Sequence, residues 1–288
     1  MPEPTDQVRD SIACGMRHVS AEQLNDLDAI MATIDPRPYF PLLDHDGDGG
    51  LALQFLTDTD AVRAYYGARH GSYEIVASRH IAAIATDFYS FRESVATLRG
   101  VGAIGDVDSS GQIFRVNSAV LFPTGPGGIG GEIVWTRYPF GDIVGGTVAP
   151  QAELDGPAHL PNLRLRNADI FEAYLDAWRA GDADAAGACL ADDVQLLRRV
   201  ADGDDHSHVR TAGRADSVDA LRAAYSERPP LVVEVLNRII TEWYVFADLY
   251  VELRRVDGGV DALRHIALHP LAEDGRIRAE MGDVRPAG

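Results

Sequence analysis

Residues 167–197 limit the fold of this chain more than any other stretch, because they read as a helix, a short helix and a strand in immediate succession. Asn167 or Asp169 can cap the first helix, and Gly181 can end it because glycine tolerates positive φ. Asp182 can then cap the second helix. Apolar residues at helical spacing predict that one stripe of the first helix faces a core, at Ile170, Phe171, Tyr174, Leu175 and Trp178.

An internal repeat divides the chain into two similar halves. The segment DAVRAYY at residues 60–66 matches DALRAAY at residues 219–225, and SFRESVATLRGV at residues 90–101 matches VFADLYVELRRV at residues 245–256. Similarity that recurs at a nearly constant separation indicates a repeated folding unit. We therefore expect two copies of one fold in this chain.

The expected domains are residues 1–147 and 163–288, joined by a linker rich in Gly and Pro at residues 148–162. In the first copy we expect helices at residues 6–18, 20–34 and 60–68, a hairpin turn at 44–50, and strands near 73–85, 88–100, 112–123 and 130–138. In the second copy we expect strands near residues 194–200, 231–241, 243–255, 261–271 and 276–284.

The sequence LDAWRAGD after Tyr174, followed by CLADDVQLL, resembles the opening of SnoaL-like proteins. These belong to the nuclear-transport-factor-like superfamily, with ketosteroid isomerase, scytalone dehydratase and polyketide cyclases. The resemblance implies a curved antiparallel sheet wrapped around helices that leaves a cone-shaped cavity. We therefore expect an α+β chain of two tandem SnoaL-like domains, packed as a pseudo-dimer, and the resemblance leaves a further homo-oligomer open.

The charge of the chain excludes several classes of function. The net charge is −18, both halves are acidic, and every basic residue is Arg because the sequence contains no Lys. Uniform acidity argues against binding to nucleic acid or to an anionic membrane surface. The absence of Lys excludes Schiff-base catalysis and the lysine of a phosphate-binding P-loop.

Targeting and redox signals are missing as well. No apolar run approaches the ~20 residues that a membrane-spanning helix needs, and the N-terminus has no signal-peptide pattern. Cys14 and Cys189 each lie in a helix-like segment and do not suggest a disulfide framework. We expect a cytoplasmic protein that uses no cofactor.

The resemblance to ketosteroid isomerase can be followed residue by residue in the second copy. The tyrosine that donates to the oxyanion in that family falls on Tyr174. A tyrosine that is simply buried in the core explains this residue equally well. The general-base aspartate falls on Arg198, and the second aspartate falls near Ala267. Steroid isomerisation is therefore disfavoured, because moving a proton between carbons needs a carboxylate or a similar base.

The strand at residues 243–254 alternates strictly between apolar and mixed residues, so one face should pack on helices. Asp248 lies on the other face among aromatic residues, and the repeat places Glu93 at the equivalent position. A carboxylate buried beside aromatic rings would have a raised pKa and could act as an acid or a base. The alternative is that this face of the strand meets solvent or packs against another sheet.

His80 lies on a strand where scytalone dehydratase-like relatives often carry a catalytic histidine that works with an aspartate. An imidazole suits acid–base catalysis at neutral pH. The matching aspartate is replaced here by His18 and Val19, and Asp35 is the nearest acidic residue.

We predict no metal site. Asp44, Asp46 and Asp48 begin like a calcium-binding loop, but the glutamate needed at its twelfth position is replaced by Phe55. His206 and His208 fall in a turn that reads as a solvated loop. His265 and His269 point to the same face of one strand, but at ~3.3 Å per residue they are about 13 Å apart, too far to share a metal.

These observations leave two functions open. The first is a cofactor-independent isomerase, dehydratase or cyclase for a polyketide-, terpenoid- or steroid-like molecule, with His80, Glu93, Tyr174, Asp248 and Arg198 as catalytic residues. The second is a non-catalytic protein that binds a small ligand or acts as a scaffold. In either case aromatic residues should line a pocket for a small hydrophobic molecule in each copy: Tyr39, Phe40, Tyr89, Phe91 and Trp135 in the first copy, and Trp178, Trp243 and Phe246 in the second.

Overall fold

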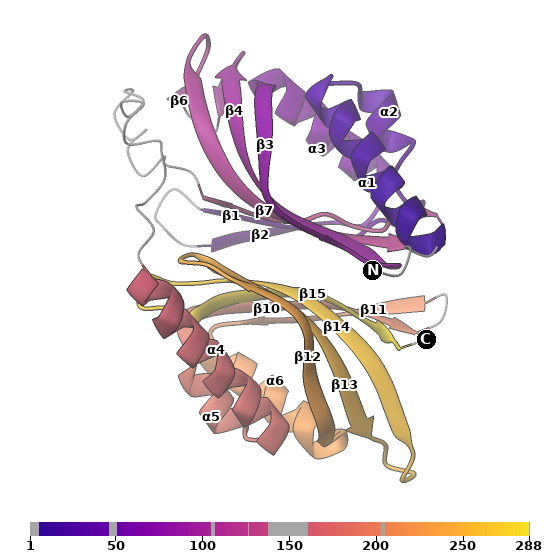
Figure 1. Cartoon of the computed structure of the whole chain (residues 1–288), viewed down its shortest axis with the longest axis vertical. Coiled ribbons are helices and arrows are strands. Elements are labelled where there is room, and N and C mark those ends of the chain that lie inside the picture. The colour runs from indigo at the N-terminus through magenta and orange to yellow at the C-terminus, as the bar shows by residue number, and fades with distance from the viewer. Residues whose placement is uncertain are drawn as a thin grey trace. The chain divides into compact units, whose positions relative to one another are not determined.

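A computed structural model describes residues 6–45, 51–104, 107–125, 127–137, 161–202 and 205–287 (Figure 1). The chain divides into two compact units, Met1–Ala158 and His159–Gly288. Most of the linker expected at residues 148–162 lies outside the described residues, and its last two residues begin a helix. The expected turn at residues 44–50 also lies largely outside them, but the strands on either side of it pair antiparallel.

The first unit combines three helices with a mostly antiparallel sheet in the order β2-β1-β9-β7-β4-β3, in which only the β1–β9 pair is parallel. Its helices are α1 (Asp6–Gln23), α2 (Leu27–Met31) and α3 (Thr59–Ser72). Its strands are β1 (Phe40–His45), β2 (Leu51–Leu56), β3 (Tyr73–Ala85), β4 (Tyr89–Gly100), β5 (Ala103–Ile104), β6 (Val107–Asp108), β7 (Ile113–Gly125), β8 (Gly128–Ile129) and β9 (Ile133–Arg137).

The second unit repeats this plan, with the sheet order β11-β10-β15-β14-β13-β12 and a parallel β10–β15 pair at the same place. Its helices are α4 (Pro161–Ala180), α5 (Ala183–Ala188) and α6 (Arg214–Glu227). Its strands are β10 (Leu190–Asp202), β11 (Asp205–Ala212), β12 (Pro230–Ile240), β13 (Tyr244–Arg254), β14 (Val260–Pro270) and β15 (Ile277–Pro286). The expected α+β class with two copies of one curved sheet and its helices is confirmed.

The break between α4 and α5 follows the local chemistry of the sequence. Gly181 adopts φ of 66°, and the side chain of Asp182 accepts hydrogen bonds from the backbone N–H groups of Asp184 and Ala185 at 3.1 and 2.9 Å. The predicted cap at Asn167 or Asp169 is wrong, because α4 already begins at Pro161. Asn167 is buried in the helix instead.

In the first unit, the two helices expected at residues 6–18 and 20–34 are one long helix, α1, and a short one, α2. The break comes at Asn25, which has φ of 52°, and the side chain of Asp26 caps α2 by accepting from Ala29 N. Asparagine tolerates this left-handed conformation better than most residues.

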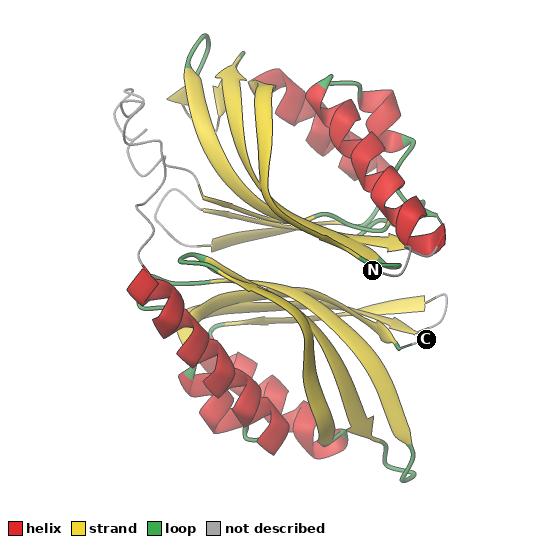
Figure 2. Ribbon diagram, viewed as in Figure 1, coloured by secondary structure: helices red, strands yellow, loops and turns green. Residues whose placement is uncertain are grey.

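Each sheet curves around the helices of its own unit, which cover one of its faces (Figures 1 and 2). In the second unit, the side chains between sheet and helices form one core cluster that includes Phe171, Leu175, Leu196, Leu221 and Val251. The predicted alternation of β13 is confirmed, because Val245, Ala247, Leu249 and Val251 all belong to this cluster. No helix in the described part of the chain is long and apolar enough to cross a membrane.

Candidate functional site

The core of the second unit contains a buried carboxylate, Glu280, on the helix-facing side of β15. The register pairs Glu280 with Leu196 of β10, which also belongs to the core cluster. The hydroxyl of Tyr174 on α4 donates to Glu280 Oε2 at 2.8 Å, and Arg198 Nε donates to Glu280 Oε1. Two residues that the sequence singled out, Tyr174 and Arg198, therefore meet at a carboxylate that it did not.

Two histidines of β14 reach the same carboxylate. His265 Nε2 lies 3.3 Å from Glu280 Oε1, and His269 Nε2 lies 3.6 Å from Glu280 Oε2. His269 Nδ1 also lies 3.3 Å from the backbone oxygen of Val245. The two residues share a face as expected, and their side chains converge on Glu280 even though their backbone positions are far apart. Gly282 leaves room for the His265 ring, because a Cβ at this position would lie 2.9 Å from His265 Nε2.

The charges of this cluster balance. Burial raises the pKa of Glu280, but Arg198 and the two nearby imidazoles outweigh burial and hold it well below its usual value. Burial lowers the pKa of Arg198, but Glu280 outweighs it, so Arg198 stays charged. Burial lowers the pKa of His265, which keeps this ring neutral at pH 7. The negative charge of Glu280 and the positive charge of Arg198 therefore cancel.

Three buried polar atoms in this cluster have no hydrogen-bond partner: Arg198 Nη2, Tyr225 Oη and His265 Nε2. Tyr225 comes from α6, and burial together with Glu280 raises its pKa although Arg198 opposes the shift. The Arg198 guanidinium lies 5.6 Å from the centre of the Trp178 ring. Because buried polar groups almost always find partners, unpaired atoms gathered at one place mark where a ligand or a water would bind.

A cavity of about 390 Å³ lies at the ends of the helices of this unit. It is lined by Ala180, Gly181, Asp182, Ala183, Asp184, Arg222, Tyr225 and Ser226. Tyr225 therefore belongs both to the wall of this cavity and to the group of unpaired polar atoms, and it joins the two.

The sheet register places a second buried carboxylate at the equivalent position of the first unit. Leu121 pairs with Ile133 in the first unit, as Leu268 pairs with Met281 in the second. Glu132 precedes Ile133 as Glu280 precedes Met281. The repeated segments DAVRAYY and DALRAAY likewise bring Tyr66 and Tyr225 to equivalent places.

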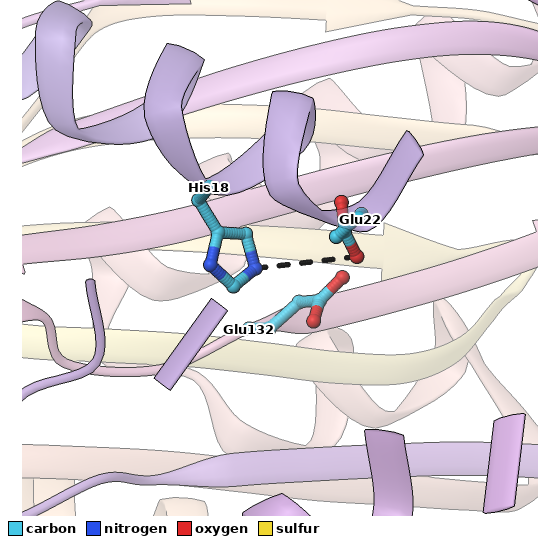
Figure 3. Close-up of side chains that lie close together, drawn as sticks. All are labelled: His18, Glu22 and Glu132. Atoms are coloured by element: carbon cyan, nitrogen blue, oxygen red, sulfur yellow. Dashed lines mark ion pairs between the residues drawn. The ribbon is translucent and has the colours of Figure 1, made fainter. Parts of the chain in front are cut away.

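In the first unit Glu132 lies close to His18 and Glu22 of α1 (Figure 3). His18 Nε2 lies 3.0 Å from Tyr66 Oη, and Tyr66 Oη is hydrogen-bonded to Glu132 Oε2. His18 Nε2 also lies 4.0 Å from Glu22 Oε1. Burial lowers the pKa of His18 to about 4, so the ring is neutral at pH 7.

The pKa values of the two carboxylates in this cluster are shifted in opposite directions. Glu22 pairs with Arg69 at 2.8 Å and with Arg92 at 3.2 Å. Burial raises the pKa of Glu22, but Arg69, His18 and Arg92 outweigh it and lower the value to about 2. Burial and the neighbouring Glu22 raise the pKa of Glu132 to about 7.

His18, Glu22 and Glu132 each offer one ligand atom, and in the described part of the chain these atoms lie within 4.8 Å of one another. The surroundings do not suit a cation, however. Two guanidinium groups already pair with Glu22, and both nitrogens of His18 face protein hydroxyls. A divalent ion would add charge beside two arginines, so the arrangement fits a hydrogen-bond network better than a metal centre.

The other predicted catalytic residues lie elsewhere. His80 on β3 is exposed, with Nδ1 3.1 Å from Ser94 Oγ. Asp248 faces away from the core cluster and is held by two nitrogens of Arg264 and by Asn237 Nδ2. Glu93 also faces away from the helices, because it alternates with Arg92, which reaches the first cluster.

The aromatic residues predicted to line the two pockets do not all lie on the helix-facing side of the sheets. Phe40 and Trp178 belong to the two core clusters, and only Trp178 contacts the Glu280 group. The register places Tyr89, Phe91, Trp135 and Phe246 on the sheet faces that point away from the helices. Tyr39 and Trp243 are buried outside the strands.

Sequence reasoning did not single out Glu280 or Tyr225, and it considered His265 and His269 only as metal ligands. The sequence signal for the two glutamates is weak: each stands just before an apolar strand residue, in GGEIVW and in IRAEMG, as do Glu74, Glu234 and Glu252. A lone carboxylate in an apolar strand is costly unless it is paired, which marks it for attention.

The topology and the polar cluster define a class: an α+β unit whose curved sheet and helices enclose buried ionisable groups. The family model described as the SnoaL-like domain matches residues 171–280, which include Tyr174, Arg198, His265 and Glu280. This part of the chain is a SnoaL-like domain, as the resemblance implied. None of the curated proteins matches the chain.

Solved structures with a similar fold each align with about half of the chain. A protein assigned as a SnoaL-like polyketide cyclase from Jannaschia sp. CCS1 is 15% identical, with 52% of this chain and 99% of that one covered and a TM-score of 0.41. A protein assigned as a polyketide cyclase from Silicibacter sp. TM1040 is 16% identical, covering 51% and 100%, with a TM-score of 0.37. A ketosteroid isomerase-like protein from Erwinia carotovora atroseptica is 12% identical, covering 47% and 99%, with a TM-score of 0.35.

Proposed function

We propose that the second unit is a cofactor-independent acid–base enzyme, an isomerase, dehydratase or cyclase for a small hydrophobic molecule of polyketide, terpenoid or steroid type. The observation that carries this proposal is the convergence of Tyr174, Arg198, His265 and His269 on the buried carboxylate of Glu280. Catalytic acids and bases need groups of this kind held together in a site sheltered from water.

His265 is the best candidate for the group that moves the proton. Its ring is neutral, and Nε2 has no hydrogen-bond partner although it lies 3.3 Å from Glu280 Oε1. When this nitrogen takes a proton from a carbon next to a carbonyl group, the adjacent carboxylate stabilises the imidazolium that forms. The same ring can return the proton to another carbon.

Arg198 Nη2 and Tyr225 Oη are the candidate donors to the oxygen of the substrate. Both are buried without a partner, and removing a proton next to a carbonyl places negative charge on that oxygen. Because Glu280 and Arg198 already cancel, a permanently charged ligand would bring an unpaired charge into the core. The balance therefore favours an uncharged carbonyl compound.

A non-catalytic ligand-binding protein is the alternative, and one observation favours it. Glu280 has protein groups at both carboxylate oxygens, so it is poorly placed to act as a base itself. A binding protein would need the donors of the cluster but no proton transfer. The roles predicted for His80, Glu93 and Asp248 remain predictions that lie outside this cluster.

Hydrogen–deuterium exchange of simple ketones tests the proposal. The chain would be incubated with cyclohexanone and acetophenone in D₂O, with binding followed by NMR and deuterium uptake next to the carbonyl followed by mass spectrometry. We expect uptake above the buffer rate, lost in His265→Gln and reduced in Arg198→Met, with the exposed Arg179→Met as the matched control. Ketones that bind without any uptake would support the binding protein instead.

A further inference from the structure

The polar cluster of the first unit has a hydrogen-bond order that can be derived from its fixed ends. Thr33 Oγ1 donates its only proton to the backbone oxygen of Ile30 at 2.6 Å, so it must accept from His18 Nδ1 at 2.7 Å. In the neutral ring, His18 Nε2 then carries no proton and must accept. The group that faces it is Tyr66 Oη, at 3.0 Å.

Tyr66 has one proton and two neighbours that can receive it, His18 Nε2 and Glu132 Oε2. If Tyr66 donates to His18, the proton in the Tyr66–Glu132 contact has to come from Glu132. The chain of bonds is thus fully satisfied when Glu132 is a neutral carboxylic acid. Burial and Glu22 act in the same direction, because they raise the pKa of Glu132 to about 7.

With Glu132 neutral, the cluster carries an excess positive charge. The titratable and charged groups that face Glu132 from the described elements are His18 and Glu22 of α1, Tyr66 and Arg69 of α3, and Arg92 of β4. His18 and Tyr66 are uncharged, and Glu22 cancels only one of the two guanidinium groups. One positive charge is left over, in contrast to the Glu280 cluster, where the two charges cancel.

The guanidinium of Arg69 has N–H groups that no acceptor uses. Arg69 Nη1 is used by Glu22, but Arg69 Nε and Nη2 are both buried and have no hydrogen-bond partner. The guanidinium is held 4.9 Å from the centre of the Tyr66 ring. Nitrogens of one guanidinium can donate side by side to the two oxygens of a carboxylate, which also carries the single negative charge that is missing here.

We propose that the first unit binds a small monovalent carboxylate at Arg69, with Glu132 in its protonated form. The site is separate from the Glu280 cluster and does not depend on the function proposed for it. Because the added negative charge lies close to Glu132, binding favours the protonated acid and takes up a proton. Affinity should therefore fall as the pH rises above the value at which Glu132 ionises.

Calorimetric titration of the full chain with sodium acetate tests this inference, with acetamide as the uncharged control of the same shape. We expect acetate to bind about tenfold more weakly at pH 8 than at pH 6, following the pKa of Glu132 of about 7, and acetamide not to bind. Glu132→Gln, which keeps a neutral hydrogen-bonding side chain, should bind acetate with no such pH dependence. Arg69→Gln should lose binding, while Arg63→Gln, exposed on the same helix, should keep it.

Two results would overturn the proposal. Equal binding of acetate and acetamide would show that charge does not matter, and acetate binding that survives in Arg69→Gln would place the anion elsewhere. If Arg69→Gln fails to fold, the ¹⁵N signals of His18 in the wild-type chain decide the question. Acetate must shift them, because His18 lies in the hydrogen-bond chain that ends at Glu132.

Discussion

Glu132 and Glu280 occupy equivalent positions, yet their neighbours shift their pKa values in opposite directions. Glu280 is hydrogen-bonded to Arg198 and Tyr174, and Arg198 holds the carboxylate in its charged form. Glu132 meets Tyr66, while the nearest guanidinium groups are engaged by Glu22. A change of one or two neighbours thus converts the same buried carboxylate from an ion to an acid.

The hydrogen bond from Tyr174 to Glu280 should contribute measurably to stability. We expect Tyr174→Phe to lower the free energy of unfolding by about 1 to 2 kcal/mol, because it leaves a buried carboxylate oxygen with one donor fewer. Tyr250→Phe is the matched control, since its hydroxyl bonds to Glu252 on a half-buried face and should cost less than about 0.5 kcal/mol. Urea denaturation measures both, and equal losses would contradict the assigned role of Glu280.

At the scale of elements, α1, α3 and the start of β9 are joined by a cluster whose two titrating members oppose each other. The pKa of Glu132 is raised from 4.5 to about 7 in the folded chain, so its contribution to stability is lost as pH rises through that range. The pKa of His18 is lowered from 6.5 to about 4, so stability is gained as pH rises from 4 to 6.5. Between pH 4.5 and 6.5 the two contributions offset.

Replacing Glu132 should expose the contribution of His18. In Glu132→Gln, we expect the free energy of unfolding, relative to the wild type, to rise between pH 4.5 and 6.5 by up to about 1.4 kcal/mol per pH unit. Chemical denaturation at four pH values in this window measures the difference between the two proteins. A difference that stays constant with pH would mean that Glu132 titrates normally and is not the neutral acid inferred above.

Local signals predicted the elements well and the site poorly. Gly181, Asp182 and the alternation of β13 are short-range features, and each of them is confirmed. The contacts of Glu280 join α4, β10, β14 and β15, and no spacing along the chain encodes such a meeting. The pocket lining proposed for the aromatic residues stays a prediction, because sheet residues are buried on both faces and alternation does not say which face a ligand would meet.

At the scale of the whole molecule, each unit has its own polar cluster beside a core cluster that packs between its large sheet and its helices. The clusters share no residue, and the described contacts of each stay within its own unit. Substitutions at sites that share no partners usually add. We therefore expect Tyr66→Phe and Tyr174→Phe to act independently on the free energy of unfolding.

The double variant Tyr66→Phe/Tyr174→Phe provides the measurement. Its loss of unfolding free energy should equal the sum of the two single losses to within about 0.5 kcal/mol. If the two units unfold in separate transitions, each single variant should shift only one of them, and the double variant should shift both by the same amounts. A coupling larger than about 0.5 kcal/mol would show that the two clusters sense each other. We would then also expect acetate bound to the first unit to change the affinity of the second unit for ketones.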